Sequence, residues 1–299
     1  MDRLSGVRVE DLQAWAIEAR EKAIGGRLPN YIPWLNQANP EALAVQIRSL
    51  DGRVISVGNE RLIFPLMSVI KPFLLLYLLI HKGRKTVFER VGKFPSNYPF
   101  YSLEQLRKDN GFPRNPMLNS GAIALADLLP GETARERCEI LQRWLNTSGN
   151  CQLFLDEPIA ESVFSLPNPR NRSLVEELEA RGYVKNSGLA LETYNYICCL
   201  SGTVGDLSKL GIVLLNSPDP IRSIVLEIMA TCGLYEDSIE FSKSVGFPTK
   251  SGVSGVVLSA IENEGSIACY SPPLDDRGNP IAGLYFLRKI ARSTFPDRI

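Results

Sequence analysis

Two residues suited to nucleophilic chemistry, Ser68 and Lys71, lie three positions apart in the segment 65–72. Residues three apart on a helix share one face, so the amine of Lys71 can approach the hydroxyl of Ser68. Burial at the start of an apolar helix would disfavour the charged form of Lys71 and lower its pKa, so that it can accept the serine proton. A single Ser-x-x-Lys match also arises by chance in a chain of this length, so an ordinary helix start stays open as an alternative.

A second chemical signal is the segment Lys250-Ser251-Gly252-Val253, which stands just before a predicted strand. It resembles the Lys-Thr-Gly element that accompanies Ser-x-x-Lys in penicillin-recognising enzymes, where the strand edge supplies a backbone N–H to the oxyanion. Taken alone, the segment could equally be an ordinary turn. The two signals together, one on an early helix and one beside a late strand, favour a serine-dependent amide hydrolase.

Several other classes of function are disfavoured by what the sequence lacks. His81 is the only histidine, so Ser-His-Asp catalysis is nearly excluded. The chain has no His-Glu-x-x-His motif, no clustered zinc ligands and no Gly-rich phosphate loop, so no metal or organic cofactor is expected. Its net charge is zero and it has no basic run, which argues against nucleic acid as a partner and for a small-molecule substrate.

The composition predicts a soluble, cytoplasmic protein without a membrane segment. The most apolar run, 73–80, is far shorter than the roughly 20 residues that a membrane span needs, and it predicts a buried core helix. The first twenty residues mix charged and apolar residues and predict no signal peptide. Six cysteines are scattered without a Cys-x-x-Cys pair, as buried thiols in a reducing compartment would be.

The elements that must position these residues include strands near both ends of the chain. Two extended runs, 44–47 and 54–57, flank Asp51-Gly52, a dipeptide suited to a tight hairpin turn. Three further strands are predicted near the other end, over 255–261, 266–270 and 281–286. We expect these strands to pair antiparallel.

The middle of the chain is predicted to be helical. Apolar residues recur there at helical period over 134–145, 172–181, 189–200 and 205–215. An α+β fold follows, in which one antiparallel sheet is built from both chain ends, is covered by helices and carries an inserted helical lobe. We expect a single domain over 1–299, with a sheet lobe formed by 25–66 and 200–299 and a mainly helical lobe over 67–199.

The sequence as a whole resembles the bacterial and mitochondrial glutaminases, whose fold is that of the serine β-lactamases. The resemblance runs over nearly the whole chain. It includes the following segments: Tyr31-Ile32-Pro33, Ser68 to Lys71, Val91 to Ser96, Pro113 to Ile123, Arg170-Asn171-Arg172, Thr231 to Tyr235, Val245 to Val253, Ser271 to Asp275 and Gly278-Asn279.

This resemblance implies roles for named residues. It implies that Ser68 is the acylated nucleophile, that Lys71 accepts its proton, and that Tyr235 is an acid/base that relays protons to departing ammonia. The backbone N–H of Val253, with that of Ser68, would form the oxyanion hole. The residues implied to hold the amino-acid end of the substrate are Tyr31, Asn119, Asn171 and Tyr194.

Two departures from the family pattern bear on the substrate. Met67 stands where the family commonly has a glutamine directly before the nucleophile. The favoured alignment places Val163 at the position of a glutamate that counters the ammonium group of the substrate, which leaves Glu161 as a candidate stand-in. An apolar replacement for a charge partner would weaken the binding of an α-amino acid or indicate a different amide substrate.

We therefore expect a glutaminase that hydrolyses L-glutamine to L-glutamate and ammonia through a Ser68 acyl-enzyme. Two alternatives remain open: a β-lactamase-like amidase acting on another small amide, and a catalytically degenerate relative that binds an amino acid or a partner protein. The resemblance also implies a homo-oligomer, either a dimer or a tetramer.

Overall fold

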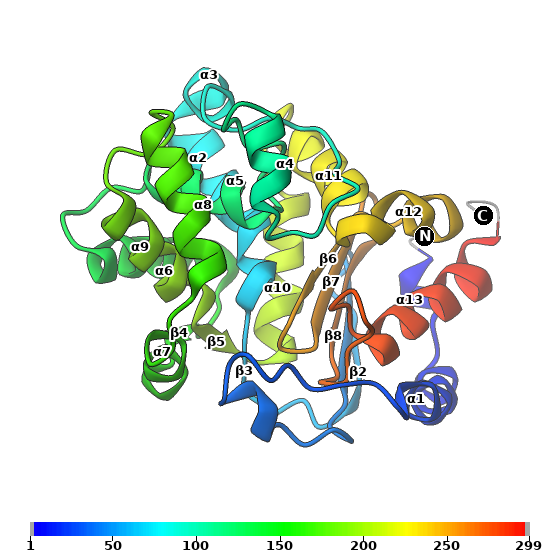
Figure 1. Cartoon of the computed structure of the whole chain (residues 1–299). Coiled ribbons are helices and arrows are strands. Elements are labelled where there is room, and N and C mark those ends of the chain that lie inside the picture. The colour runs from blue at the N-terminus through cyan, green and yellow to red at the C-terminus, as the bar shows by residue number, and fades with distance from the viewer. Residues whose placement is uncertain (1–2, 297–299) are drawn as a thin grey trace.

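The main sheet joins the two ends of the chain. The computed structural model of the protein describes residues 3–296 (Figure 1). Five antiparallel strands form this sheet in the order β2-β1-β8-β7-β6. Their bounds are β1 (Ala44–Ser49), β2 (Val54–Gly58), β6 (Thr249–Gly252), β7 (Val256–Ile261) and β8 (Gly265–Tyr270). Because β1 pairs directly with β8, Val45 lies opposite Cys269 although the two are far apart in the sequence.

The predicted hairpin of β1 and β2 is confirmed. Val45 pairs with Val57 and Ile47 with Ile55. Gly52 in the turn has a φ of 94°, a left-handed conformation that glycine adopts without steric cost. The two strands predicted over 255–261 and 266–270 are also confirmed, as β7 and β8. The sheet is therefore built from both ends of the chain, as expected.

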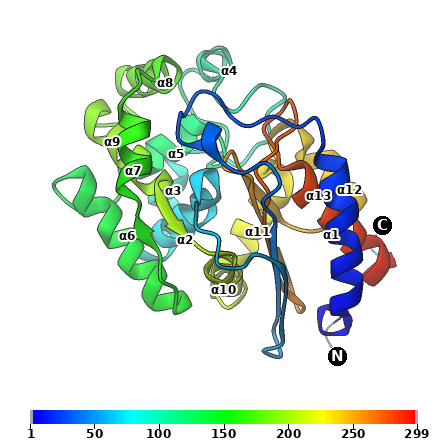
Figure 2. The same cartoon turned by 90° about the horizontal axis from the view of Figure 1, so that it is seen from below.

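Helices cover both faces of this sheet. Helices α1 (Val9–Ala23) and α13 (Ile281–Thr294) pack together on one face, and α10 (Val204–Leu215) lies against the other, as the two perpendicular views show (Figures 1 and 2). The approach of α10 is close because Gly211 faces the sheet: a Cβ there would lie 2.4 Å from Cβ of Ser266. The apolar core accordingly divides into one cluster between the sheet and α1 with α13, and a larger one beneath the other helices.

The prediction of a third late strand over 281–286 was wrong, because this segment is the start of α13. The apolar residues of the segment do not stop at Phe286. Leu287, Ile290 and Ala291 continue the buried face at helical spacing, which the short window of the strand prediction cut off. The helix begins directly after Pro280, whose carbonyl accepts the N–H of Leu284.

The helical part of the molecule lies beside the sheet and contains the predicted central helices. All four of these are confirmed within a few residues at their ends. The helices before α10 are α2 (Lys71–His81), α3 (Gly83–Phe88), α4 (Leu103–Lys108), α5 (Asn119–Ala126), α6 (Ala134–Gly149), α7 (Glu157–Phe164), α8 (Pro169–Ala180) and α9 (Ser187–Cys198). Those after it are α11 (Ile221–Cys232) and α12 (Ser238–Val245). A small sheet of β3 (Phe64–Pro65), β5 (Leu200–Gly202) and β4 (Phe154–Leu155), in that order, links the two parts.

Helix α2 is the central core helix, as predicted from its apolar run. Every residue from Lys71 to Leu79 is buried. Over residues 3–296, no helix combines the length and the apolar character needed to cross a membrane. The burial of α2 matters for the chemistry, because it carries the amine of Lys71 at its first position into the interior.

Candidate active site

The backbone is strained directly before Ser68. After β3 the chain enters a short 3-10 turn, η3 (Met67–Ile70), in which Met67 has a φ of 45°. A long side chain rarely adopts this left-handed conformation, and such strain persists only where the surroundings enforce it. Two hydrogen bonds fix the backbone just before Met67: Leu66 N donates to Leu200 O (2.8 Å), and Ser254 Oγ donates to Pro65 O (2.7 Å).

Lys71 is fully buried and has only neutral hydrogen-bond partners. Its Nζ donates to Met117 O (2.9 Å) and to Asn119 Oδ1 (2.8 Å). No carboxylate within residues 3–296 forms an ion pair with it. Burial therefore lowers the pKa of Lys71 to about 7. A lysine that is half neutral near pH 7 can accept a proton.

A second buried lysine, Lys250, lies in β6 rather than in the loop before a strand. Its Nζ donates to Gly233 O and to Ser251 O, both at 2.7 Å. Burial, and next the charge of Lys71, lower the pKa of Lys250 well below its ordinary value. The same amine lies 4.3 Å from the ring centre of Tyr235. The Ser68–Lys71 pair and the Lys250 segment, which were predicted separately from the sequence, therefore lie close together in the structure.

Tyr235 is the second strained residue of the site. It has a φ of 58°, and the other non-glycine residues with positive φ in the described chain are Met67 and three asparagines, which tolerate that conformation better. Burial raises the pKa of Tyr235 to about 12, while the nearby hydroxyls of Ser68 and Ser251 act to lower it. Even so, the Tyr235 hydroxyl makes no hydrogen bond of ordinary geometry within residues 3–296. Because it is buried and unpaired near Ser68, it is available to a reacting group.

Three helices bring together a network of polar side chains beside Lys71. Asn119, at the start of α5, donates through Nδ2 to Asn171 Oδ1 of α8 (2.9 Å). Its Oδ1 accepts the hydroxyl of Tyr194 from α9 (3.0 Å) in addition to the Lys71 amine. Asn119, Asn171 and Tyr194 are buried, so the network orients these predicted binding residues.

The end of β6 packs against the turn that carries Ser68. A Cβ on Gly252 would lie 2.8 Å from Leu66 O, so only glycine allows the strand to come this close to η3. Val253 follows immediately, and its N–H donates to no backbone group of the described chain. A free N–H beside the nucleophile is the feature that an oxyanion hole requires.

These groups surround one cavity of about 660 Å³. Predicted site residues that line it are Tyr31, Ser68, Asn119, Asn171, Tyr194 and Val253. Tyr31 is 52% exposed. Lys71 and Tyr235 are not part of the lining and are almost completely buried. Such a volume suits a small organic substrate.

The glutaminase family model matches residues 26–295 of the sequence. The chain belongs to the glutaminase family. Among curated relatives, a glutaminase of Synechocystis is 46% identical over 294 residues, covering 96% of this chain and 90% of the relative. A glutaminase of Geobacillus kaustophilus is 34% identical, covering 95% of this chain and 96% of the relative.

Solved glutaminase structures share the fold. The probable glutaminase ybaS superposes with a TM-score of 0.87 at 28% identity, covering 96% of this chain and 97% of that one. A probable glutaminase from Bacillus subtilis in complex with 6-diazo-5-oxo-L-norleucine superposes with a TM-score of 0.86 at 27% identity, covering 96% of each chain. The predicted family, the amidohydrolase class and the serine β-lactamase-like fold are confirmed.

Val163 and Glu161, the two residues considered from the sequence for the position that faces the ammonium group of the substrate, differ in their location. Val163 lines the cavity. Glu161, two residues earlier on α7, is exposed and is not part of the lining. Glu161 therefore lies on the exposed surface of α7 and outside the cavity.

Other charged residues line the cavity of the glutaminase and were assigned no role from the sequence. Glu236, half-buried, forms no ion pair within residues 3–296, and the same holds for Arg170, whose guanidinium lies 4.1 Å from the ring centre of Tyr101. By contrast, Arg27 pairs with Asp276 (3.3 Å). The sequence signal that could have identified them is their position next to predicted site residues, because Glu236 directly follows Tyr235 and Arg170 directly precedes Asn171.

Proposed function

We propose that this glutaminase hydrolyses L-glutamine to L-glutamate and ammonia through an acyl-enzyme on Ser68. The Ser68 hydroxyl attacks the side-chain amide carbon, and neutral Lys71 takes its proton. The observation that carries this proposal is the buried Lys71, whose pKa is lowered to about 7 and which has no acidic partner within residues 3–296. A lysine in that state can act as a base at physiological pH.

Later steps use the groups around the nucleophile. The N–H groups of Ser68 and Val253 stabilise the negative oxygen of the tetrahedral intermediate. Tyr235 passes a proton to the amide nitrogen as the C–N bond breaks and regains one from protonated Lys71, so the leaving group departs as ammonia and Lys71 is neutral again. Water then attacks the Ser68 ester while Lys71 takes one of its protons, and Lys71 returns that proton to the Ser68 oxygen as the ester bond breaks and glutamate is released. No metal or organic cofactor takes part in this sequence.

Recognition of glutamine requires groups for a carboxylate and an ammonium. We assign the polar network of Asn119, Asn171 and Tyr194, with Tyr31 at the cavity, to the amino-acid end of the substrate. Three acids line the cavity: Asp276 pairs with Arg27, Asp275 accepts the backbone N–H groups of Arg277 and Asn279, and Glu236 has neither an ion pair nor a side-chain hydrogen bond within residues 3–296. We therefore propose Glu236 as the partner of the ammonium group in preference to Glu161, which is exposed outside the cavity.

Substrate assays separate glutamine from the alternative of another small amide. Glutamine should be turned over faster than an amide of the same length that lacks the α-amino group, because only glutamine uses the charge of Glu236. Installing a second acid by Val163→Glu should lower KM for glutamine, since Val163 lines the cavity. Equal turnover of both amides, with KM unmoved in that variant, would favour the other amidase.

The acyl-enzyme is tested by ammonia release and by labelling. Ser68→Ala should abolish ammonia release while the protein stays folded, because no other described group replaces the hydroxyl that becomes the ester. A diazo-ketone analogue of glutamine should add one label to the wild-type protein, on Ser68. A label on a cysteine, or wild-type turnover by Ser68→Ala, contradicts the mechanism.

We also propose a cytoplasmic setting and a homo-oligomer. The six cysteines, all described, are buried free thiols, which suits a reducing compartment. The proposal of a homo-oligomer is based on the family resemblance. Light scattering coupled to size-exclusion chromatography would measure the mass of the assembly. A small-molecule substrate remains the expected partner, since the net charge of zero gives nucleic acid no electrostatic attraction.

A further inference from the structure

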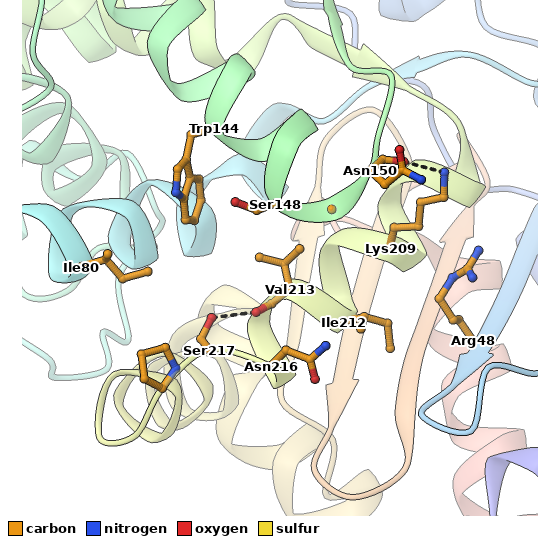
Figure 3. Close-up of a pocket in the computed structure, with 12 residues that line it drawn as sticks. Arg48, Ile80, Trp144, Ser148, Asn150, Lys209, Ile212, Val213, Asn216 and Ser217 are labelled. Carbon is orange, nitrogen blue, oxygen red and sulfur yellow. Dashed lines mark hydrogen bonds between the residues drawn. The ribbon is translucent and has the colours of Figure 1, made fainter.

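A second cavity, of about 550 Å³, shares no lining residue with the catalytic one. It lies between α6, α10 and the end of α2, and Arg48 reaches it from β1 (Figure 3). Ile80 lines it from the last turn of α2, whereas Lys71 begins that helix. The cavity is therefore a separate site at the other end of the core helix.

The side chains of Arg48 and Lys209 line this cavity, and no Asp or Glu does. Arg48 donates only to neutral oxygens, Ser208 Oγ (3.2 Å) and Gln46 Oε1 (3.3 Å). Lys209 Nζ likewise donates to a backbone carbonyl, Asn150 O (2.8 Å). Within residues 3–296 neither cation forms an ion pair. Two cations in one cavity without a carboxylate favour binding of an anion.

The nearest acid on the same helix is occupied elsewhere. Asp206, one turn before Lys209 on α10, caps that helix by accepting Thr203 N and Thr203 Oγ1. Its other oxygen accepts Gln152 N at 3.0 Å. Burial also lowers the pKa of Arg48, as expected for a cation that no acid compensates, and a guanidinium nevertheless stays charged. The positive charge of the cavity is thus not neutralised by the described chain.

The other end of the cavity is apolar. Trp144 and Ile80 lie together away from the two cations in Figure 3, and Ile212 and Val213 of α10 form the wall between the two ends. The side-chain amide of Asn216, which is exposed to solvent, lies at the same cavity and has no hydrogen-bond partner within residues 3–296. The cavity therefore offers a charged end, an apolar end and one free amide.

We propose that this second cavity binds a small organic anion, with its oxyanion at Arg48 and Lys209 and an aromatic or aliphatic tail against Trp144. A guanidinium presents paired N–H donors that match a carboxylate or a phosphate, and a neighbouring ammonium adds a third donor. The volume is within the range of sites for small molecules. The ligand is an oxyanion with a tail, either a carboxylate or a phosphate ester.

Titration calorimetry with four probes tests this site on the full chain. Phenylacetate and phenyl phosphate should bind once per chain, and the stronger of the two identifies the oxyanion. Phenethylamine, which has the ring but the opposite charge, should not bind. Inorganic phosphate should bind more weakly than phenyl phosphate, because it lacks the tail that contacts Trp144. Equal binding of the amine and the anions would overturn the proposal.

Matched variants locate the ligand. Arg48→Gln and Lys209→Gln should each weaken the anionic probes about tenfold or more, because each loses a charge-assisted donor. Arg20→Gln and Lys243→Gln make the same change of charge at exposed positions and should bind as the wild type does. If Arg48→Gln fails to fold, the affinity of the Lys209→Gln variant still tests the proposal, because Lys209 is partly exposed. Wild-type affinity in Lys209→Gln would overturn the proposal.

The catalytic cavity is excluded by a third variant. Arg170 lines that cavity and could itself attract an anion. Arg170→Gln should leave the affinity for phenylacetate and phenyl phosphate unchanged if they bind at Arg48 and Lys209. Loss of binding in Arg170→Gln would place the probes in the catalytic cavity and overturn the proposal. The readout is binding and not ammonia release, so this result is independent of the proposed glutamine hydrolysis.

Discussion

The rate of glutamine hydrolysis should rise about tenfold between pH 6 and pH 8, since neutral Lys71 is the proposed base. Burial lowers the pKa of Lys71 to about 7. With that pKa, the neutral fraction is about 9% at pH 6, about half at pH 7 and about 91% at pH 8. The sign follows from the chemistry: the deprotonated amine accepts the serine proton, so activity is lost as the pH falls through the pKa of Lys71.

The assay is the initial rate of ammonia release at glutamine concentrations well below KM, at constant ionic strength from pH 5.5 to 8.5. These conditions report kcat/KM, and thus the ionisation of the free enzyme. Asn119→Asp is a sharp companion variant, because Asn119 Oδ1 lies 2.8 Å from the Lys71 amine. An aspartate there would favour the charged lysine and move the midpoint of the profile to higher pH, whatever happens to its amplitude.

Three results would refute this reasoning. A flat profile from pH 6 to 8 would mean that no group with a pKa near 7 limits the reaction. An unshifted midpoint in Asn119→Asp would mean that the limiting group is not Lys71. Substantial activity of Lys71→Arg would show that the position needs only a positive charge, since arginine stays protonated at any working pH.

The remaining predictions concern recognition, the leaving group and the fold. Glu236→Gln should raise KM for glutamine about 10- to 100-fold with little change in kcat, whereas Glu161→Gln should leave KM unchanged; steady-state kinetics measure both. Tyr235→Phe should lower kcat about 10²- to 10⁴-fold without moving KM much, and ammonia release measures it. Gly233→Ala should lower the free energy of unfolding by about 1–3 kcal/mol or more in a urea titration, because its Cβ would lie 1.8 Å from Thr249 O.

The features that could be predicted from the sequence are those encoded locally. The run after Lys71 is apolar at every position, and the structure makes it the central helix. Asp51-Gly52 between two alternating runs predicted the hairpin with the correct strands. The pair of Ser68 and Lys71 could be found because three residues of helix bring two side chains to one face.

Other features depend on tertiary contacts and could not be predicted. The strained φ of Met67 exists only because β5 and the residues after β6 hold the preceding backbone, and nothing in the local sequence indicates it. The proposed role of Glu236 depends on how the neighbouring acids are engaged, since Asp276 pairs with Arg27 and Asp275 accepts backbone N–H groups. The helix after Pro280 was mistaken for a strand because Ile281 to Phe286 is apolar at nearly every position, a pattern that fits both structures.

The pairing of β1 with β8 has a consequence for synthesis on the ribosome. Val45 cannot pair with Cys269 until the ribosome has synthesised roughly 220 further residues. At a translation rate of about 5–20 residues per second, this interval lasts on the order of 10–40 s. During that time one edge of β1 has no strand to pair with, and unpaired strand edges readily join other chains. We therefore expect intermolecular pairing of the nascent protein to begin at β1, and chaperones that cover this edge to improve its yield.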